Sequence, residues 1–473
     1  MNKLIKKYKE LPQVTHASIA YVFCVCLQKG IQVITWPVFT RLLSLEQYGQ
    51  YTLYVAWEEI ASIFLTLNLA TGMFPKAMEI FSNKREKYIA TCQTIGVLLS
   101  IIFSVVLLLF YKSLEKVLSL PAILLFIMVI NVCTYLPIQL WESRCRFENR
   151  YKSVVMVTAL YTIISPILSL IFVLNNDNKG VAMIIGMVVL PIIMGVFFLV
   201  YNYITSKAFI DKELFIFAFR SHLPLVAFFL SSTVLNQSDR IMINYYCGKD
   251  KSAMYGVSYS LAMMITLVTG ALNNSFIPFL YENIKINNIK AIRKRSTYNF
   301  IIISFLILGI IIFAPEAIML VGGKKYFQAI WIIPPVAGSV ILIAVSQLFI
   351  NVQIYLEEKK TIVVSSVMVM FLNIILNILF LPKYGYYAAG YTTLVSYFIY
   401  MIVNYIIYKK MIQKREISEL YNMLDYVKIC IIVEAFALLG IIAYYNFVIR
   451  LLLFCLIILV LYLINRRRPV ISK

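Results

Sequence analysis

Residues 301–312 read IIISFLILGIII, and a helix built from them would be apolar on every face. They lie in a longer hydrophobic span, residues 298–321, which has the length of about 20 residues that a helix needs to cross the hydrocarbon core of a bilayer. A membrane-spanning β-strand would instead alternate apolar and polar residues over about ten positions. This stretch therefore predicts a transmembrane helix.

Similar spans recur along the whole chain of 473 residues. Hydrophobic residues make up 61% of the sequence and charged residues 14%, whereas a soluble domain is roughly 45–50% apolar. We predict an all-α polytopic membrane protein with about 14 transmembrane helices, because backbone polar groups must be satisfied within each segment where water is absent. The predicted spans are residues 15–39, 48–70, 88–111, 121–141, 154–174, 180–203, 222–246, 252–280, 298–321, 329–356, 361–381, 386–408, 426–445 and 447–465.

Lysine and arginine residues concentrate in every second connecting segment. If the N-terminus lies inside, 31 of the 43 lie in inner segments, 10 in outer segments, and Lys29 and Arg240 within spans. This asymmetry follows the positive-inside rule, so we predict that both termini are cytoplasmic. Basic loops at an anionic leaflet also account for most of the formal net charge of +21, so no nucleic acid partner is expected.

An internal repeat divides the sequence. The run YGQY at residues 48–51 returns as YGVSY at 255–259, an offset of 207, and the pair Leu-Asn at 67–68 returns at 272–273, an offset of 205. Six helices separate the copies, so both copies have the same orientation and are related by an axis along the membrane normal. We predict two pseudo-symmetric six-helix lobes and a C-terminal helix pair. The predicted divisions are residues 1–205 (first lobe), 206–410 (second lobe) and 411–473 (helix pair and basic cytoplasmic tail).

Five ionisable residues within the predicted spans are the main candidates for a functional role: Lys29, Glu58, Glu59, Asp239 and Arg240. Glu316, near the outer end of its span, and Glu434, in the C-terminal helix pair, are weaker candidates. Each costs about 2.5–3.5 kcal/mol on insertion scales, so these residues should pair or handle a substrate. Lys29 and Glu58 both lie about 15 Å from the outer ends of their helices and can meet across the first hairpin.

Two hypotheses for these charges stay open. Under the functional hypothesis, Lys29 and Arg240 bind a phosphate, and Glu58, Glu59 and Asp239 serve an ion that couples to transport. Under the alternative, Lys29 pairs with Glu58, and Arg240 pairs with Asp239 or a carbonyl group, only to neutralise charge.

Nothing in the sequence indicates catalysis or metal binding. The eight cysteines show no paired metal-ligand spacing, and the longest loops, near residues 204–221 and 281–297, are short and carry no cluster of catalytic carboxylates. We therefore expect no catalytic residues, no metal and no cofactor.

Several motifs resemble one family of membrane proteins. They are KG at residues 29–30, FTRLLSLEQYGQY at 39–51, LNQSDRIMI at 235–243, APE at 314–316 and LPKYGYYAAG at 381–390. Together they resemble bacterial polysaccharide flippases of the Wzx type, within the multidrug/oligosaccharidyl-lipid/polysaccharide (MOP) exporter superfamily.

The resemblance implies a function at the bacterial inner membrane. A flippase of this kind moves an undecaprenyl-diphosphate-linked oligosaccharide repeat unit to the outer leaflet by alternating access, for O-antigen of lipopolysaccharide or for capsule. Lys29, Asp239 and Arg240 are the matched positions expected to act. By analogy, a proton or sodium gradient drives transport, and a polysaccharide polymerase and chain-length proteins are expected partners.

Three alternatives stay open beside this function: a cation-coupled multidrug exporter of the same superfamily, a lipid II flippase, and a membrane-embedded glycosyltransferase or polymerase. Lys29 and Arg240 add positive charge at depth, which favours an anionic cargo over organic cations. The short loops argue against an enzyme. Lipid II carries the same lipid diphosphate as the expected cargo, so these observations do not distinguish a lipid II flippase from a glycan flippase.

Overall fold

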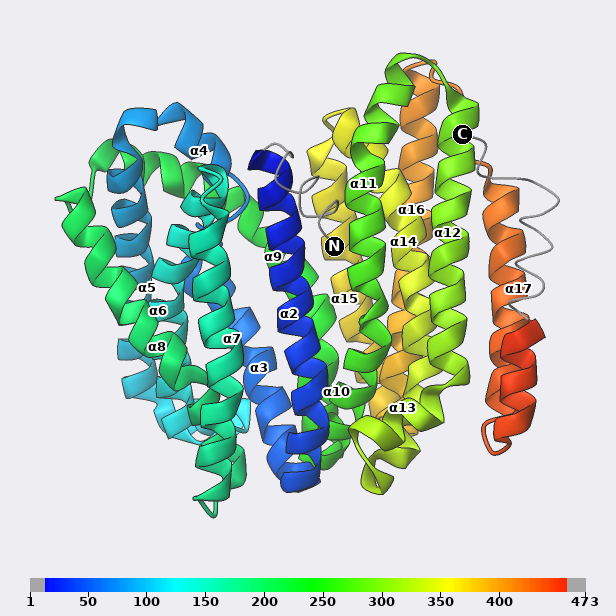
Figure 1. Cartoon of the computed structure of the whole chain (residues 1–473), viewed down its shortest axis with the longest axis horizontal. Helices are drawn as coiled ribbons and strands as arrows, with labels where there is room; N and C mark the ends of the chain where they lie inside the picture. Colours follow the sequence, from blue (N-terminus) through cyan, green and yellow to red (C-terminus); the bar gives the residue numbers. More distant parts are fainter. Residues whose placement is uncertain (1–12, 457–473) are drawn as a thin grey trace, which may run out of the picture. The chain divides into compact units, whose positions relative to one another are not determined.

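The computed structural model describes residues 13–456, and within them the chain is helical, with no β-strand (Figure 1). The described part divides into two compact units, of which the first ends at Ile241 and the second begins at Met242. The first unit contains α2 (Gln13–Leu42), α3 (Leu45–Thr66), α4 (Phe74–Ile80), the 3₁₀ helix η1 (Ser82–Lys84), α5 (Arg85–Leu118), α6 (Ala122–Phe147), α7 (Tyr151–Leu174), α8 (Lys179–Ser206) and most of α9 (Lys212–Cys247).

The second unit contains the rest of the described helices: α10 (Lys249–Met263), α11 (Ile265–Lys285), α12 (Ile289–Ile312), α13 (Ala314–Val321), η2 (Lys324–Ile332), α14 (Ile333–Tyr355), α15 (Lys359–Tyr384), α16 (Tyr387–Lys414) and α17 (Met423–Ile442). In this unit α14 packs against α12 and α16, and α15 packs against α16. The predicted lobe boundaries at residues 205 and 410 stay a prediction.

Between residues 13 and 456, eleven helices are long and apolar enough to cross a membrane, which confirms an all-α polytopic membrane protein. Two other predicted spans coincide with α3 and α17, which carry several charged residues, among them Glu58 and Glu59 in α3 and Asp425, Lys428 and Glu434 in α17. The last predicted span, residues 447–465, begins with a shorter apolar helix, Phe447–Leu456, and its remainder lies outside the described residues.

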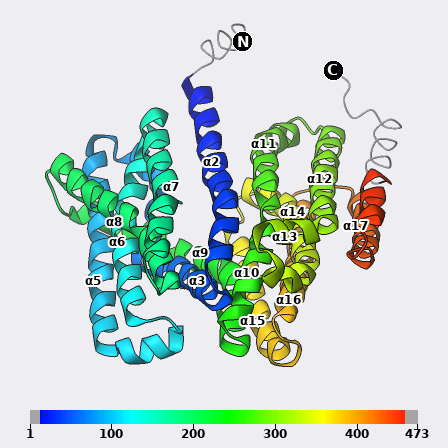
Figure 2. The same cartoon turned by 60° about the horizontal axis from the view of Figure 1, so that its bottom comes forward.

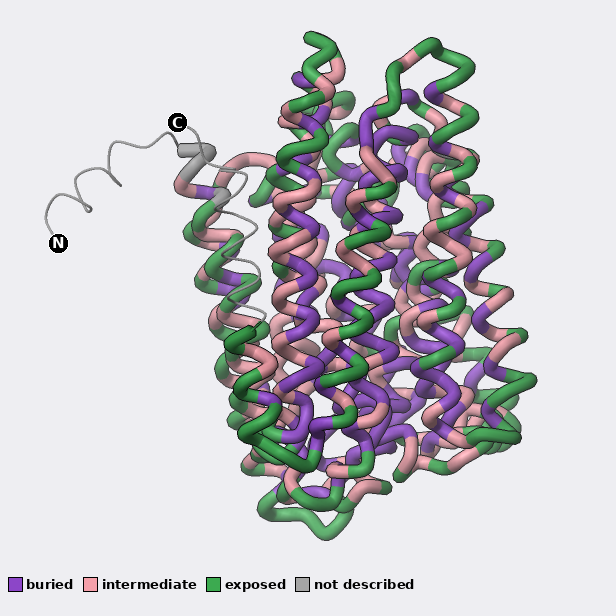
Figure 3. Tube along the Cα trace, turned by 90° about the vertical axis from the view of Figure 1, so that its right-hand side faces the viewer, coloured by how far each residue is buried: buried purple, intermediate pink, exposed green. Residues whose placement is uncertain are grey.

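Large apolar side chains on the outside of the helices agree with a lipid environment. On α5, Leu98, Ile101, Ile102, Val105 and Leu109 follow a spacing of three to four residues and are all exposed. A continuous apolar face of this kind is unfavourable in water and favourable against lipid tails. Exposed stretches also run along the outward sides of the helices in Figure 3, with buried stretches between them.

α8 packs against both α6 and α7, and the three helices lie together in Figures 1 and 2. Small residues on α8 allow this close packing. A Cβ atom added to Gly186 would lie 2.3 Å from the Cα atom of Ser169 on α7. One added to Gly195 would lie 2.1 Å from the carbonyl oxygen of Thr134 on α6. Lipid tails are as apolar as leucine, so helices in a bilayer associate by close packing, which small residues permit.

Several predicted spans are interrupted; the span 252–280, for example, passes from α10 to α11 at Met264. The span 48–70 ends when α3 stops at Thr66, because Leu67 (φ 47°) and Asn68 (φ 50°) adopt the left-handed conformation. Near this break, the Nε2 atom of His222 on α9 lies 3.3 Å from the carbonyl oxygen of Thr71. The span 298–321 likewise ends at Ile312, and a separate short helix, α13, starts with a proline in its first turn, where the missing N–H costs nothing.

Several arginines that the sequence analysis assigned to basic inner loops are neutralised by glutamates. Arg144 donates to Glu86 at 2.5 Å and to Glu148 at 2.9 Å, and Arg146 donates to Glu142 at 3.2 Å. The pair of Arg144 with Glu86 joins the end of α6 to the first turn of α5, and the other two pairs lie within the end of α6. The positive charge open to a lipid head group on this side is therefore smaller than the sequence count suggests.

The close contact of α8 with α6 leads to a testable prediction. We expect Gly195→Ala to lower the free energy of unfolding by about 1–3 kcal/mol, because the added methyl group meets backbone atoms that cannot move aside easily. Thermal unfolding of the purified protein in detergent measures this. Gly309→Ala is the matched control, since its Cβ would approach only Phe454, at 3.8 Å, and it should be neutral or stabilising. Equal stability of both variants would contradict the packing argument.

Candidate functional site

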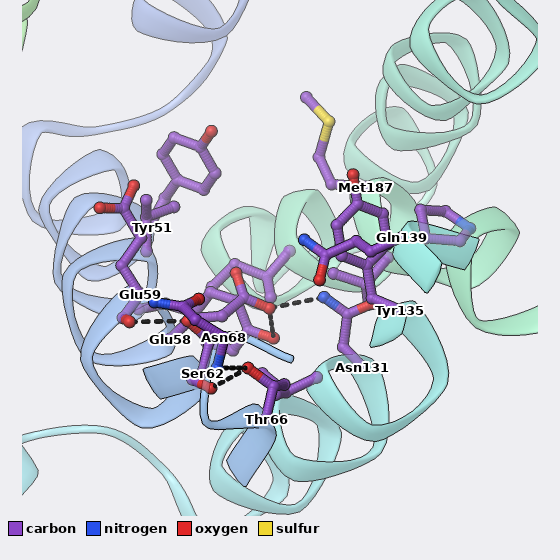
Figure 4. Close-up of a pocket in the computed structure, with 16 residues that line it drawn as sticks. Tyr51, Glu58, Glu59, Ser62, Thr66, Asn68, Asn131, Tyr135, Gln139 and Met187 are labelled. Carbon is purple, nitrogen blue, oxygen red and sulfur yellow. Dashed lines mark hydrogen bonds between the residues drawn. The ribbon is translucent and has the colours of Figure 1, made fainter. Parts of the chain in front are cut away.

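A cavity of about 380 Å³ opens inside the first unit, between α3, α6 and α8 (Figure 4). Its polar lining comes from α3 and the segment that follows, and from α6, whereas α8 contributes apolar residues. The residues that line it are Tyr51, Tyr54, Val55, Glu58, Glu59, Ser62, Thr66, Asn68, Asn131, Val132, Tyr135, Gln139, Ile184, Met187, Val188 and Pro191.

Helical periodicity places these side chains together. On α3, Tyr51, Val55, Glu58 and Ser62 recur at spacings of three and four, so they project from one face of the helix. On α6 the lining positions recur in the same way. In Figure 4 the asparagine of α6, Asn131, points toward the carboxylate of Glu58 on α3. The two helices therefore face each other with polar sides.

Glu58 is held by neutral hydrogen-bond donors. Asn131 donates from Nδ2 to Glu58 Oε1 at 2.5 Å, and the hydroxyl of Tyr54 donates to the same oxygen at 3.3 Å. The Oδ1 atom of Asn131 is buried without a hydrogen-bond partner. A carboxylate and a spare acceptor oxygen thus line one cavity, and such a set of oxygens suits a cation or the hydroxyl groups of a ligand.

The structure does not bring Lys29 and Glu58 together, in contrast to the pairing hypothesis. Gln28, the residue before Lys29, donates to the hydroxyl of Tyr161 on α7 at 3.1 Å, so this side of α2 faces α7. Lys29 itself is exposed and donates to Gln32 at 3.3 Å. Among the described residues, no ion pair joins Lys29 to Glu58.

Glu59 connects to Arg240 through a residue that the sequence analysis did not select, Gln237. The Nε2 atom of Gln237 donates to Glu59 Oε2, and Arg240 donates from Nη1 to Gln237 Oε1 at 2.6 Å. Gln237 and Arg240 are buried, with 6% and 8% exposure. All three residues belong to the first unit, so α3 and α9 are joined there by a polar bridge.

The signal for Gln237 was present in the sequence. It precedes Arg240 by three positions, which is close to one helical turn, so both side chains project from one side of α9. An amide can donate to one ion and accept from another, which a charged side chain cannot do. Asp239, by comparison, is completely buried on α9 and does not line the cavity.

Glu316, in the APE motif, has a structural partner. Arg450 donates to its two carboxylate oxygens at 2.5 and 2.6 Å and to the carbonyl oxygen of Ile312 at 2.8 Å. Arg450 is 3% exposed and lies near the start of the last predicted span, residues 447–465. This bidentate pair fastens the end of α12 and the start of α13 to the segment after α17.

Sequence comparisons place the chain among proteins of glycan synthesis. A family model described as "Polysaccharide biosynthesis protein" matches residues 15–284. The chain is also 22% identical over 359 residues to the Lsg locus putative protein 1 of Haemophilus influenzae, a match that covers 70% of this chain and 84% of that protein.

Solved structures with the same fold are membrane transporters. A lipid II flippase, MurJ, in an inward closed conformation superposes with a TM-score of 0.70 at 15% identity and covers 97% of this chain and 100% of that chain. An inward-facing multidrug resistance MATE family transporter of the MOP superfamily gives a TM-score of 0.65 at 12% identity, over 84% of this chain and 98% of that chain. A mutant of the Vibrio cholerae MATE transporter VcmN gives 0.59 at 14% identity, over 85% and 97%.

The bridge through Gln237 can be tested by a double-mutant cycle. We expect Gln237→Leu to lower the free energy of unfolding by about 1 kcal/mol, because Glu59 and Arg240 lose their shared partner. Glu59→Gln and Gln237→Leu together should cost less than the sum of the two single changes, with a coupling of at least about 0.5 kcal/mol. Thermal unfolding of the three variants measures the coupling. Strictly additive effects would show that the two side chains do not support each other.

Proposed function

The chain belongs to the polysaccharide biosynthesis protein family, and we propose that it moves a lipid-linked glycan across the membrane by alternating access. The observation that carries the proposal is the cavity of the first unit. It places two carboxylates, Glu58 and Glu59, among membrane-spanning helices, where an ionisable group marks a pathway for a substrate or an ion.

The proposed cargo is an undecaprenyl-diphosphate-linked oligosaccharide, for O-antigen or capsule synthesis at the bacterial inner membrane, with both termini of the chain cytoplasmic. Lys29 supports an anionic head group: it is exposed on α2, and the only described residue that accepts from its ammonium group is Gln32. A lysine ammonium has three donors, so donors are left for a phosphate. A polysaccharide polymerase and chain-length proteins are the proposed partners downstream.

Arg240 is proposed to serve the cargo from a more enclosed position. It is buried and donates to Gln237, which in turn holds Glu59, so its charge acts on the carboxylate that lines the cavity. A guanidinium group can donate through several N–H groups at once, and direct contact with a phosphate stays a prediction for this residue.

Glu58 and Glu59 are the proposed site of the coupling ion, a proton or sodium, and Asp239 stays proposed for ion coupling or charge pairing. Glu58 accepts only neutral hydrogen bonds from Asn131 and Tyr54 among its described partners. A carboxylate without a cationic partner in a membrane gains most from binding a proton or a metal cation.

Deletion of the gene tests the cargo. We expect surface glycan to be lost and undecaprenyl-linked repeat units to accumulate in the cytoplasmic leaflet, as measured by extraction and mass spectrometry of lipid-linked intermediates. Arrested peptidoglycan synthesis with accumulation of lipid II would instead establish a lipid II flippase. Unchanged glycan with altered drug susceptibility would establish a multidrug exporter and contradict the proposal.

Complementation of that deletion tests the two cations. Lys29→Ala should reduce export by about tenfold or more, because one charge-assisted hydrogen bond to phosphate is lost. Its protein level should stay normal, since Gln32 is the only residue in the described part of the chain that accepts a hydrogen bond from Lys29. Arg240→Ala should abolish export. Lys29→Arg keeps the charge and is the matched control. Normal export by both alanine variants would leave these residues without a role in cargo binding.

The carboxylates are tested in proteoliposomes that carry a fluorescent lipid-linked glycan. An imposed proton or sodium gradient should accelerate flipping by the unchanged protein, and Glu58→Gln and Glu59→Gln should remove this acceleration, because a neutral amide cannot exchange the ion. Glu46→Gln is the control, since Glu46 lies in the first turn of α3, away from the cavity. Full acceleration in both cavity variants would place the coupling site elsewhere.

A further inference from the structure

The second unit has a cavity of its own, of about 250 Å³, between α11, α12 and α14, which pack against one another (Figure 1). Its polar lining consists of hydroxyl and amide groups: Thr266, Thr269, Asn273, Asn299 and Gln347. The same cavity also contacts the ring of Phe276. Among the residues that the structure describes, no lysine, arginine, aspartate or glutamate lines it, so this lining is polar without charge.

The internal repeat relates this lining to that of the first cavity. At the offset of 207 residues, Thr266 stands where the first copy has Glu59, and Thr269 where it has Ser62. With this offset, a hydroxyl group stands in the second copy where the first has the carboxylate of Glu59. The first cavity can attract a cation through its charge, whereas the second can recognise a ligand only through neutral hydrogen bonds and shape.

Hydrogen-bonding groups in this cavity are left for a ligand. The Oδ1 atom of Asn299 is buried without a hydrogen-bond partner, and the residue is 7% exposed. The amide of Gln347 also lines the cavity, and no hydrogen bond joins it to any residue in the described part of the chain. A buried acceptor that is left unpaired destabilises the fold, so a ligand that donates a hydrogen bond to it would be bound favourably.

The chemistry of the lining selects the class of ligand. Without a cationic side chain it is unsuited to a phosphate, and without a carboxylate it offers little to compensate the desolvation of a cation. Its volume is far larger than the roughly 30 Å³ that one water molecule occupies in the liquid. Amides and hydroxyls beside an aromatic ring fit a sugar, which carries alternating hydroxyl donors and acceptors and an apolar C–H face.

We propose that this cavity binds an uncharged sugar ring of the lipid-linked glycan through Asn299, Gln347 and the two threonines. This inference rests on the proposed function and extends it, because it separates recognition of the sugar in the second unit from the charged residues Lys29, Glu58 and Glu59 of the first.

The test uses the full chain purified into lipid nanodiscs and two probes, undecaprenyl diphosphate and undecaprenyl-diphospho-N-acetylglucosamine. Asn299→Leu should weaken binding of the glycosylated probe by about tenfold and leave binding of undecaprenyl diphosphate unchanged. Its thermal stability should be equal or higher, because the change removes an unpaired buried acceptor and nearly preserves the volume. Gln347→Leu provides a second variant should the first fail to fold.

Ser339→Ala is the matched control, since Ser339 is buried on α14 outside this cavity and donates to Val336. It should bind both probes as the unchanged protein does. Equal loss of both probes in Asn299→Leu and Gln347→Leu, or no loss in either variant, would overturn the sugar site and leave the proposed function standing. If the unchanged protein binds neither probe, the proposed function itself fails.

Discussion

The absence of water from the middle of a bilayer is the constraint on which the rest of this structure depends. It requires helices, because only they satisfy the backbone within one segment, and it allows leucine and isoleucine to cover the outside of α5. It also removes the hydrophobic driving force between helices, so α8 approaches its neighbours through Gly186 and Gly195. Polar side chains are collected in cavities inside each unit, where they can act on a ligand.

Hydropathy located the helices well, because the requirement for about 20 apolar residues leaves a long and unambiguous pattern in the sequence. It could not locate the breaks. The end of α3 depends on the left-handed backbone of Leu67 and Asn68, and the residues Leu272 and Asn273 of the second copy lie inside the unbroken helix α11. The same dipeptide thus adopts two conformations, and contacts made elsewhere in the fold decide between them.

For the candidate site, the sequence predicts how far along its helix each charged residue lies, but not which neighbouring helix its side chain faces. Lys29 and Glu58 were correctly placed on adjacent helices, yet the hydrogen bond between Gln28 and Tyr161 turns α2 toward α7. Rotation of a helix about its axis is set by packing, which a single sequence does not contain. Neutral residues such as Gln237 and Asn131 were missed for a related reason: they cost less than charges in a membrane and so do not stand out.

The hydrogen bonds that link Arg240 through Gln237 to Glu59 all run in one direction. Each of them points from the guanidinium group toward the carboxylate, because the amide oxygen accepts on one side and the amide nitrogen donates on the other. If the amide turned over, its oxygen would face the carboxylate and its nitrogen the guanidinium, and both contacts would repel. The three side chains therefore depend on one another. If evolution replaced the donor Arg240 by an acceptor, the acceptor Glu59 would have to be replaced by a donor, and the amide of Gln237 would turn over between them.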